Sequence, residues 1–246
     1  MKLPKWYEQP WIGFDTETTG TDPMIARILQ AAILTHDPEG ILAEEDRAVY
    51  INPGVPIPPQ ASQIHGLTIE KLIKLRATGP QNAIPYILEM INRRATLRSY
   101  PLVIYNTSYD WPLLLAECKR LPAFHLPGTR TPLFLDPLII DRAMDKYRKG
   151  SRKLEDTARF YEVELTGAHG AQADAKAALG IMGVLISTYP ELKTHTLAEL
   201  QQLQAEWYEE WKDHLNEYWE RTGRAERITG SWPLGEAEAV AVGAAR

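Results

Sequence analysis

The stretch that decides the fold is WIGFDTETTG, residues 11–20. Its first four residues are apolar, which predicts a short buried strand ending at Asp15. Asp15 and Glu17 are two positions apart, so on a strand their side chains point the same way. We therefore expect two carboxylates side by side at a strand end, where α/β sheets place their sites. Taken alone, such a pair is more often a solvated edge.

Beyond this strand, the sequence predicts two more strands, and after them strands that alternate with helices. Residues 27–36 form a second apolar run, DPEG at 37–40 is a turn signal, and 46–51 suits the return strand of a hairpin. A proline-rich loop is expected at 52–59. Further strands are predicted at 102–105 and 133–135, and helices at 68–75, 80–95, 108–121, 137–146, 153–161 and 171–188. The order predicts an α/β fold, with helices flanking a mixed five-stranded sheet.

The composition changes after residue 190. Residues 196–222 have the pattern of a long amphipathic helix, and 223–246 turn to Gly, Ala and acidic residues that we expect to end as a flexible tail. We therefore expect a main domain over 1–190 and a C-terminal helical extension over 191–246 that packs on it. The helix has an aromatic stripe, for which packing on the core or on a second copy is favoured over docking a polymerase or another partner. Its members are Trp207, Trp211, Tyr218 and Trp219. Residues 231–234 (SWPL) could anchor the end.

The bulk composition excludes several classes of protein. The 246 residues include 27 Lys+Arg and 32 Asp+Glu, for a net charge of −5, with 44% hydrophobic residues. These values suit a globular chain and exclude a collagen or a wholly disordered protein. Cys118 is the only cysteine, so a disulfide within the chain and a thiolate zinc site are excluded, and a reducing, cytoplasmic compartment fits. No apolar run predicts a transmembrane helix or a signal peptide, so we expect no membrane partner.

Three further residues extend the acidic pair. Asp110 follows the predicted strand at 102–105, although a helix-start aspartate favoured by the helix dipole is the simpler interpretation for that residue alone. His169 lies in a glycine-flanked loop, where an imidazole can titrate near neutral pH. Asp174 falls one turn into a helix of small residues, which would let that helix approach the sheet closely.

The order of these motifs is specific. Asp-x-Glu on a first strand, Asn-x-x-x-Asp after an apolar strand, and His-x-x-x-x-Asp opening a helix resemble the DnaQ-like 3′–5′ exonucleases of the DEDD superfamily, in the subgroup with a catalytic histidine and with proofreading exonucleases of the polymerase III epsilon type. The resemblance covers about residues 11–188 and includes 63–68 (QIHGLT) and 135–138 (LDPL). It implies an RNase H-like fold. Tyr105, Tyr109 and Gly170 depart from the usual family residues, and none of them removes a ligand.

The residue types suit metal-dependent hydrolysis. Carboxylates that converge repel each other, at about 4 kcal/mol per pair at ~4 Å and an effective dielectric of ~20, unless protons or cations neutralise them. Oxygen ligands select hard cations, so we expect two Mg²⁺ or Mn²⁺ ions. The predicted ligands are Asp15, Glu17, Asp110 and Asp174. His169 is the predicted general base for the attacking water.

The expected substrate is the 3′ end of a nucleic acid. The resemblance implies that Thr16, Thr18, His65 and Asn106 surround the terminal nucleotide, and that nucleoside 5′-monophosphates are released. Single-stranded DNA is favoured and RNA is possible, with proofreading, repair and end maturation all open. The basic segment 142–153 could follow a phosphate backbone or could be a solvated loop. The alternatives are an exoribonuclease or a non-catalytic module that binds nucleic-acid ends or a polymerase. A zinc hydrolase is disfavoured, because the six histidines show no ligand spacing.

Overall fold

The computed structural model describes residues 5–36, 47–121 and 131–235. A five-stranded sheet has the order β3-β2-β1-β4-β5. Its strands are β1 (Trp11–Thr18), β2 (Ile28–His36), β3 (Arg47–Tyr50), β4 (Leu102–Val103) and β5 (Phe134–Leu135). The β1–β2 and β2–β3 pairs are antiparallel, whereas β4 and β5 run parallel to β1. The expected mixed five-stranded sheet is therefore confirmed. The turn expected at 37–40 lies outside the described residues.

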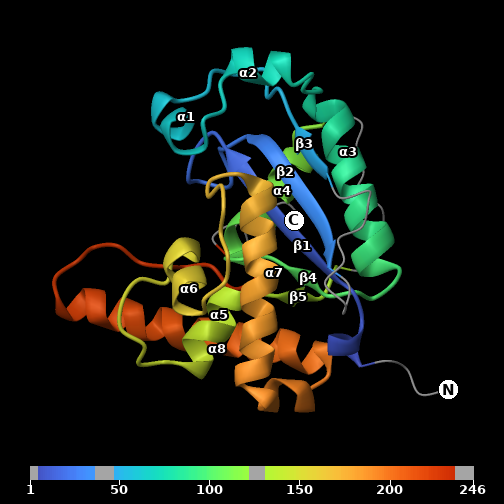
Figure 1. Ribbon diagram of the computed structural model, residues 1–246. Coiled ribbons are helices and arrows are strands. Elements are labelled where there is room, and N and C mark those ends of the chain that lie inside the picture. Colours follow the sequence, from blue (N-terminus) through green and yellow to red (C-terminus); the bar gives the residue numbers. More distant parts are fainter. Residues whose placement is uncertain (1–4, 37–46, 122–130, 236–246) are drawn as a thin grey trace, which may run out of the picture.

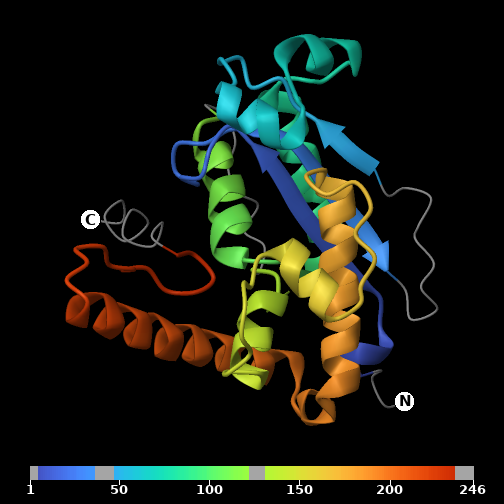
Figure 2. The same ribbon diagram turned by 60° about the vertical axis from the view of Figure 1, so that its left-hand side comes forward.

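Helices cover both faces of the sheet (Figures 1 and 2). One face packs its apolar side chains against α3 (Pro80–Ile91) and α4 (Thr107–Lys119). The other packs against α5 (Pro137–Met144) and α7 (Ala171–Thr188). The remaining elements are η1 (Trp6–Glu8), α1 (Pro59–His65), α2 (Ile69–Lys74), η2 (Asn92–Thr96), α6 (Leu154–Phe160), η3 (Pro190–Thr194) and α8 (Leu197–Arg221). No helix in the described ranges is long and apolar enough to cross a bilayer.

Helix α7 lies unusually close to β1, and Gly13 makes this possible. A Cβ at Gly13 would be 2.7 Å from Leu179 Cδ1 and 3.1 Å from the carbonyl oxygen of Ala175. Only a residue without a side chain fits such an approach. Because Gly13, Asp15 and Glu17 alternate along one strand, both carboxylates face the side of the sheet that α7 covers.

Some boundaries differ from those expected. β1 continues to Thr18 instead of ending at Asp15, because its polar end still pairs with β2, a contact that an apolar pattern cannot reveal. Helix α1 was not expected. It begins with Pro59 at its first position and ends at Gly66, which has a left-handed φ of 67°. The helix expected at 80–95 is the α-helix α3 followed by a π-helical turn, η2.

The C-terminal extension packs on the sheet and on α5. Gln204 of α8 is fully buried, accepts a hydrogen bond from Asp136 N (2.7 Å) and donates one to Phe134 O (3.0 Å). After α8 the chain doubles back along the helix (Figure 2). Trp232 is buried and packs edge-on against Phe134. Part of the segment expected to be a flexible tail is therefore packed, and its anchor is the SWPL sequence.

Candidate active site

Three carboxylates meet where β1 ends beneath the first turn of α7. Asp15 and Glu17 come from β1 and Asp174 from α7, and each offers an oxygen within 4.8 Å of the others. Helix α7 starts after Gly170 and has its small residues Ala171 and Ala175 buried against the sheet. This small-residue face brings Asp174 to the strand, as the sequence pattern indicates.

Asp110 approaches from the opposite side of the sheet. It lies in the first turn of α4, is buried, and accepts a hydrogen bond from Thr16 Oγ1 at 2.5 Å. Asp110 is not part of the 4.8 Å group, but it lines the same pocket of about 400 Å³ as Asp15, Glu17 and Asp174. The four acids expected from the sequence are thus brought to one pocket, three of them in mutual reach.

Burial raises the pKa of all four of these carboxyl groups, and repulsion from the other acids of the site adds to the shift at Asp15 and Glu17. Burial, followed by the charges of its three acidic neighbours, raises the pKa of Asp15 well above its usual range. Burial, followed by the charges of Asp174 and Asp110, raises the pKa of Glu17 to about 8. Burial raises the pKa of Asp110 to about 7 and that of Asp174 to about 6. A site of this kind gains free energy from a bound cation, which would relieve the repulsion.

The donor set fits a hard divalent cation. Its ligand atoms are carboxylate oxygens, which Mg²⁺ and Mn²⁺ prefer to nitrogen or sulfur. Asp174 Oδ1 is buried and has no hydrogen-bond partner among the described residues. A buried carboxylate oxygen without a donor is costly unless a cation completes its contacts. The cluster could therefore bind metal.

His169 lies at the rim of the same pocket. Its side chain is about half exposed, and its Nε2 is 3.0 Å from Glu155 Oε1. The backbone of His169 is left-handed, with φ 65°, so the residue lies on a tight turn before α7. No role for Glu155 was predicted from the sequence. Its carboxylate contacts Nε2 of the His169 ring. To accept a proton through Nε2, the imidazole has to leave this carboxylate.

The four residues expected around a terminal nucleotide divide into two pairs. Thr16 and Asn106 line the pocket. His65 is outside that lining and lies 3.2 Å from Thr18 O through Nε2, while its Nδ1 accepts from Leu67 N at 3.0 Å. This pattern fixes a neutral ring with its proton on Nε2. Burial lowers the pKa of His65, which agrees with the neutral form.

Tyr109 and Asp136 support the site, and neither was assigned a role from the sequence. The Tyr109 hydroxyl donates to Gly20 O and lies 2.6 Å from Thr18 Oγ1, so α4 is linked to the end of β1. The buried Asp136 carboxylate accepts from the backbone N–H groups of Asn106 (3.0 Å) and Thr107 (2.8 Å) at the start of α4. These bonds hold the left-handed Asn106, φ 66°, and so orient the turn that carries Asp110.

The segment after α8 contacts Asp136, which supports the start of α4. Trp232 Nε1 donates to Asp136 Oδ2 at 3.3 Å. The sequence offered this segment, SWPL at 231–234, as a candidate anchor. Its partner, 96 residues earlier in the chain, could not be read from any local pattern.

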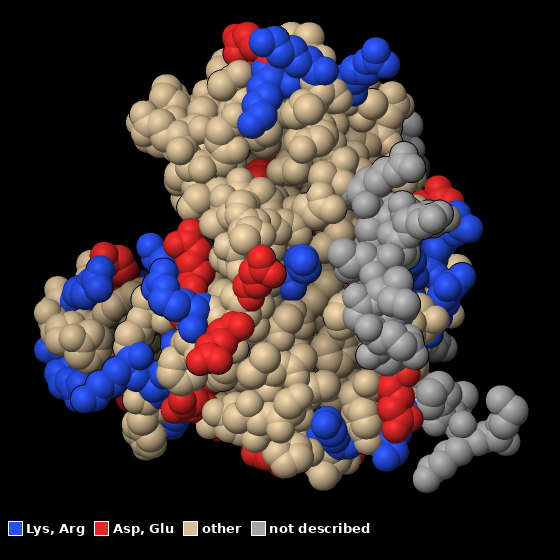
Figure 3. All heavy atoms as spheres, viewed as in Figure 1, with Lys and Arg blue, Asp and Glu red and all other residues tan. Residues whose placement is uncertain are grey.

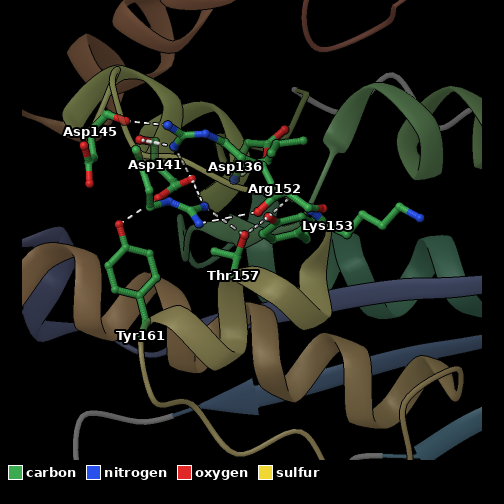
Figure 4. Close-up of polar contacts among 11 residues, drawn as sticks. Asp136, Asp141, Asp145, Arg152, Lys153, Thr157 and Tyr161 are labelled. Carbon is green, nitrogen blue, oxygen red and sulfur yellow. Dashed lines mark hydrogen bonds and ion pairs between the residues drawn. The ribbon is translucent and has the colours of Figure 1, made fainter.

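A second buried network borders the pocket. The Asp141 carboxylate is fully buried and forms ion pairs with Arg148 (2.7 Å) and Arg152 (2.5 Å). It also accepts from the Tyr161 hydroxyl at 2.7 Å, a contact shown with Arg152 in Figure 4. The Lys153 side chain extends away from this network, and both Arg152 and Lys153 line the acidic pocket. Two cations of the basic segment 142–153 therefore line the same pocket as the carboxylates.

Comparisons with known proteins agree with this arrangement. A family model described as Exonuclease matches residues 12–182. The chain is 25% identical to DNA polymerase III subunit epsilon of Treponema pallidum over 192 residues, covering 76% of this chain and 81% of that protein. It is 29% identical to human three prime repair exonuclease 2 over 196 residues, covering 70% and 81%.

A solved structure shows the same fold. Exonuclease I of Escherichia coli, in complex with a dT13 oligonucleotide, superposes with a TM-score of 0.56 at 22% identity. The match covers 75% of this chain but 42% of that protein, so the chain corresponds to less than half of exonuclease I. The RNase H-like architecture and the DnaQ-like resemblance are both confirmed. From its matched domain, the chain belongs to the Exonuclease family of nucleic-acid hydrolases.

Proposed function

We propose that this protein is a metal-dependent 3′–5′ exonuclease that removes nucleoside 5′-monophosphates from the 3′ end of single-stranded DNA. The observation that carries the proposal is the pocket in which Asp15, Glu17, Asp110 and Asp174 converge from three elements. A purely structural site gains nothing from such a concentration of buried acids. The named relatives supply the direction, since they include a repair exonuclease described by the three prime end.

In this proposal the four carboxylates hold two Mg²⁺ or Mn²⁺ ions. Two such ions, when bound, stabilise the attacking and the leaving oxygens of a phosphodiester displacement. The chain's own residues do the rest. His169 on the pocket rim accepts the proton of the attacking water, and Thr16 and Asn106 contact the terminal nucleotide. Thr18 and His65, linked through the Thr18 carbonyl, form the adjoining wall.

The choice of DNA rests on the comparisons. Exonuclease I was solved with a dT13 oligonucleotide, and the epsilon relative is named as a polymerase subunit. We place this protein in replication proofreading or repair, with RNA 3′ ends as the second candidate substrate. A polymerase or a second copy would meet α8, on which Tyr218 is about half exposed. We take 1–190 as the exonuclease domain and 191–246 as its C-terminal helical extension.

The test is a 5′-labelled 20-nucleotide DNA strand incubated with Mg²⁺ or Mn²⁺. Wild-type protein should shorten the strand one nucleotide at a time, and EDTA should stop the reaction. Asp15→Asn should lose about a hundredfold to a thousandfold in kcat, the range for removing one group that stabilises the transition state. Asp213→Asn, at an exposed position of α8, is the matched control and should retain wild-type activity.

Three results would contradict the proposal. They are an intact strand with wild-type protein, full activity of Asp15→Asn, and loss of label from the 5′ end. A matched RNA strand and a DNA duplex tested in parallel decide the substrate class. Faster trimming of RNA than of DNA would replace the DNA assignment.

A further inference from the structure

A pocket of about 540 Å³ lies between α5, the loop that follows it, and α8. Its volume is within the roughly 300–1,000 Å³ range of ligand sites. Its lining combines cations of the basic segment with aromatic residues of the C-terminal helix. The lining residues used below are Arg142, Lys146, Arg148, Arg152, Trp207, Glu210 and Trp211.

The charge of this pocket is positive. Four of its side chains are cationic, and Glu210 is the acidic member of the lining. Arg148 and Arg152 share the single Asp141 carboxylate, which leaves an excess positive charge in that network. Figure 3 shows Lys and Arg side chains gathered at the lower left, where α8 and the connection between α5 and α6 lie in Figure 1.

Arg142 is the most informative residue of the lining. Its guanidinium carbon lies 3.9 Å from the centre of the Trp211 ring, so the cation is held against an aromatic face. Within the part of the chain that the structure describes, Arg142 forms no ion pair and no hydrogen bond, although its side chain is partly buried. A guanidinium offers five N–H donors in a planar fork that matches a phosphate.

The pocket shares a lining residue with the acidic site. Arg152 contributes to the lining of both, and Lys153 lines the acidic pocket next to it. Because a 3′ terminus ends in the acidic site, any neighbouring site that the strand reaches must hold nucleotides on the 5′ side of the cleaved bond. Cations for the backbone and aromatic rings for the bases are the combination that binds single strands without sequence preference.

We propose that the pocket between α5 and α8 is a second subsite for single-stranded nucleic acid, which binds a phosphate and a base on the 5′ side of the nucleotide being removed. This inference rests on the proposed exonuclease function. It gives the C-terminal extension a part in substrate binding, since Trp207 and Trp211 belong to α8.

The experiment compares a 12-nucleotide strand with a dinucleotide. Arg142→Gln should lower the ratio of kcat/KM for the long strand to kcat/KM for the dinucleotide about tenfold, the loss expected when a phosphate contact and its stacked neighbour are weakened. Lys146→Gln, at an exposed position, should lower the ratio in the same direction and does not depend on a partly buried side chain. Lys119→Gln, an exposed cation at the end of α4, is the matched control and should leave the ratio unchanged.

Binding is measured separately by fluorescence anisotropy of a labelled 12-mer in EDTA. Each of the two pocket variants should reduce the slope of log affinity against log salt by about 0.7, the value for one phosphate of a single strand.

Unchanged ratios and unchanged slopes in both variants would overturn the subsite, while trimming by the wild type would still support the proposed function. If the wild type cleaves neither substrate, the proposed function fails, and reduced slopes would still support nucleic-acid binding at the pocket. Displacement of the 12-mer by hexaglutamate at equal concentration would overturn the nucleic-acid assignment in favour of an acidic peptide.

Discussion

Replacing Glu17 with glutamine should make the metal-free protein more stable. The substitution keeps the shape of the side chain and removes its charge. In the folded chain, burial and the neighbouring acids raise the pKa of Glu17 from its ordinary 4.5 to about 8. Between these two pH values the folded chain binds a proton that the unfolded chain has released. The free energy of unfolding of the wild type therefore falls as the pH rises from 4.5 to 8.

The size of the effect follows from the same two values. Each pH unit within this window lowers the free energy of unfolding of the wild type by about 1.4 kcal/mol. At pH 7 the wild type should therefore be about 3 kcal/mol less stable than the glutamine variant, whose side chain does not titrate. In a chain of this length that difference corresponds to about 6–12 °C in Tm. Added Mg²⁺ or Mn²⁺ should reverse the order, because the cation binds the wild-type site more tightly and stabilises only the folded state.

The assay is urea unfolding in EDTA at pH 4.5, 6, 7 and 8, followed by the same series with Mn²⁺. Glu89→Gln, in which an exposed glutamate of α3 is replaced, is the control and should stay within about 0.5 kcal/mol of the wild type. Equal stability of wild type and Glu17→Gln at pH 7 in EDTA would refute the electrostatic reasoning. So would a difference that does not shrink toward pH 4.5.

Three other predictions concern the supports of the site. Gly13→Ala should lower the free energy of unfolding by about 1–3 kcal/mol and reduce kcat, because the new methyl group pushes α7 and Asp174 away from β1. Thermal melts and trimming assays measure both effects. Gly183→Ala is the control and should be tolerated, because the added methyl group has open space. Trp232→Phe should cost about 1–3 kcal/mol in urea unfolding by removing the donor to Asp136, and an unshifted midpoint would contradict that contact. Asp141→Asn should cost about 3–5 kcal/mol, since two arginines lose their buried counter-charge, and calorimetry should then show a lower Tm.

The sequence predicts the parts of the fold that depend on local pattern. The apolar runs locate four of the strands, the alternation at 46–51 locates the other one, and the small residues of 171–188 indicate a helix that can lie close to the sheet. The spacing of Asp15 and Glu17 predicts their common direction, and the motif order indicates that Asp110 and Asp174 join them. The roles of these residues in catalysis and metal binding stay predictions.

What the sequence does not predict depends on contacts between distant segments. Asp136 is the N-cap of α5, a role that was not assigned from the sequence, and its bond to Trp232 joins residues 96 positions apart. The bond from His169 to Glu155 depends on how α6 lies beside the loop before α7. The pocket between α5 and α8 depends on the packing of α8 beside β5, to which Gln201 and Gln204 are hydrogen-bonded, and no periodicity in either segment indicates that pairing.

The position of Gly235 has a practical consequence for handling the protein. A Cβ built there would be 2.9 Å from the carbonyl oxygen of Ser108, two residues before Asp110. A fluorophore attached at position 235 would therefore press against the first turn of α4, which carries Asp110. Trp11 starts β1 at the opposite end of the strand from Glu17, so labels are better attached on the amino-terminal side.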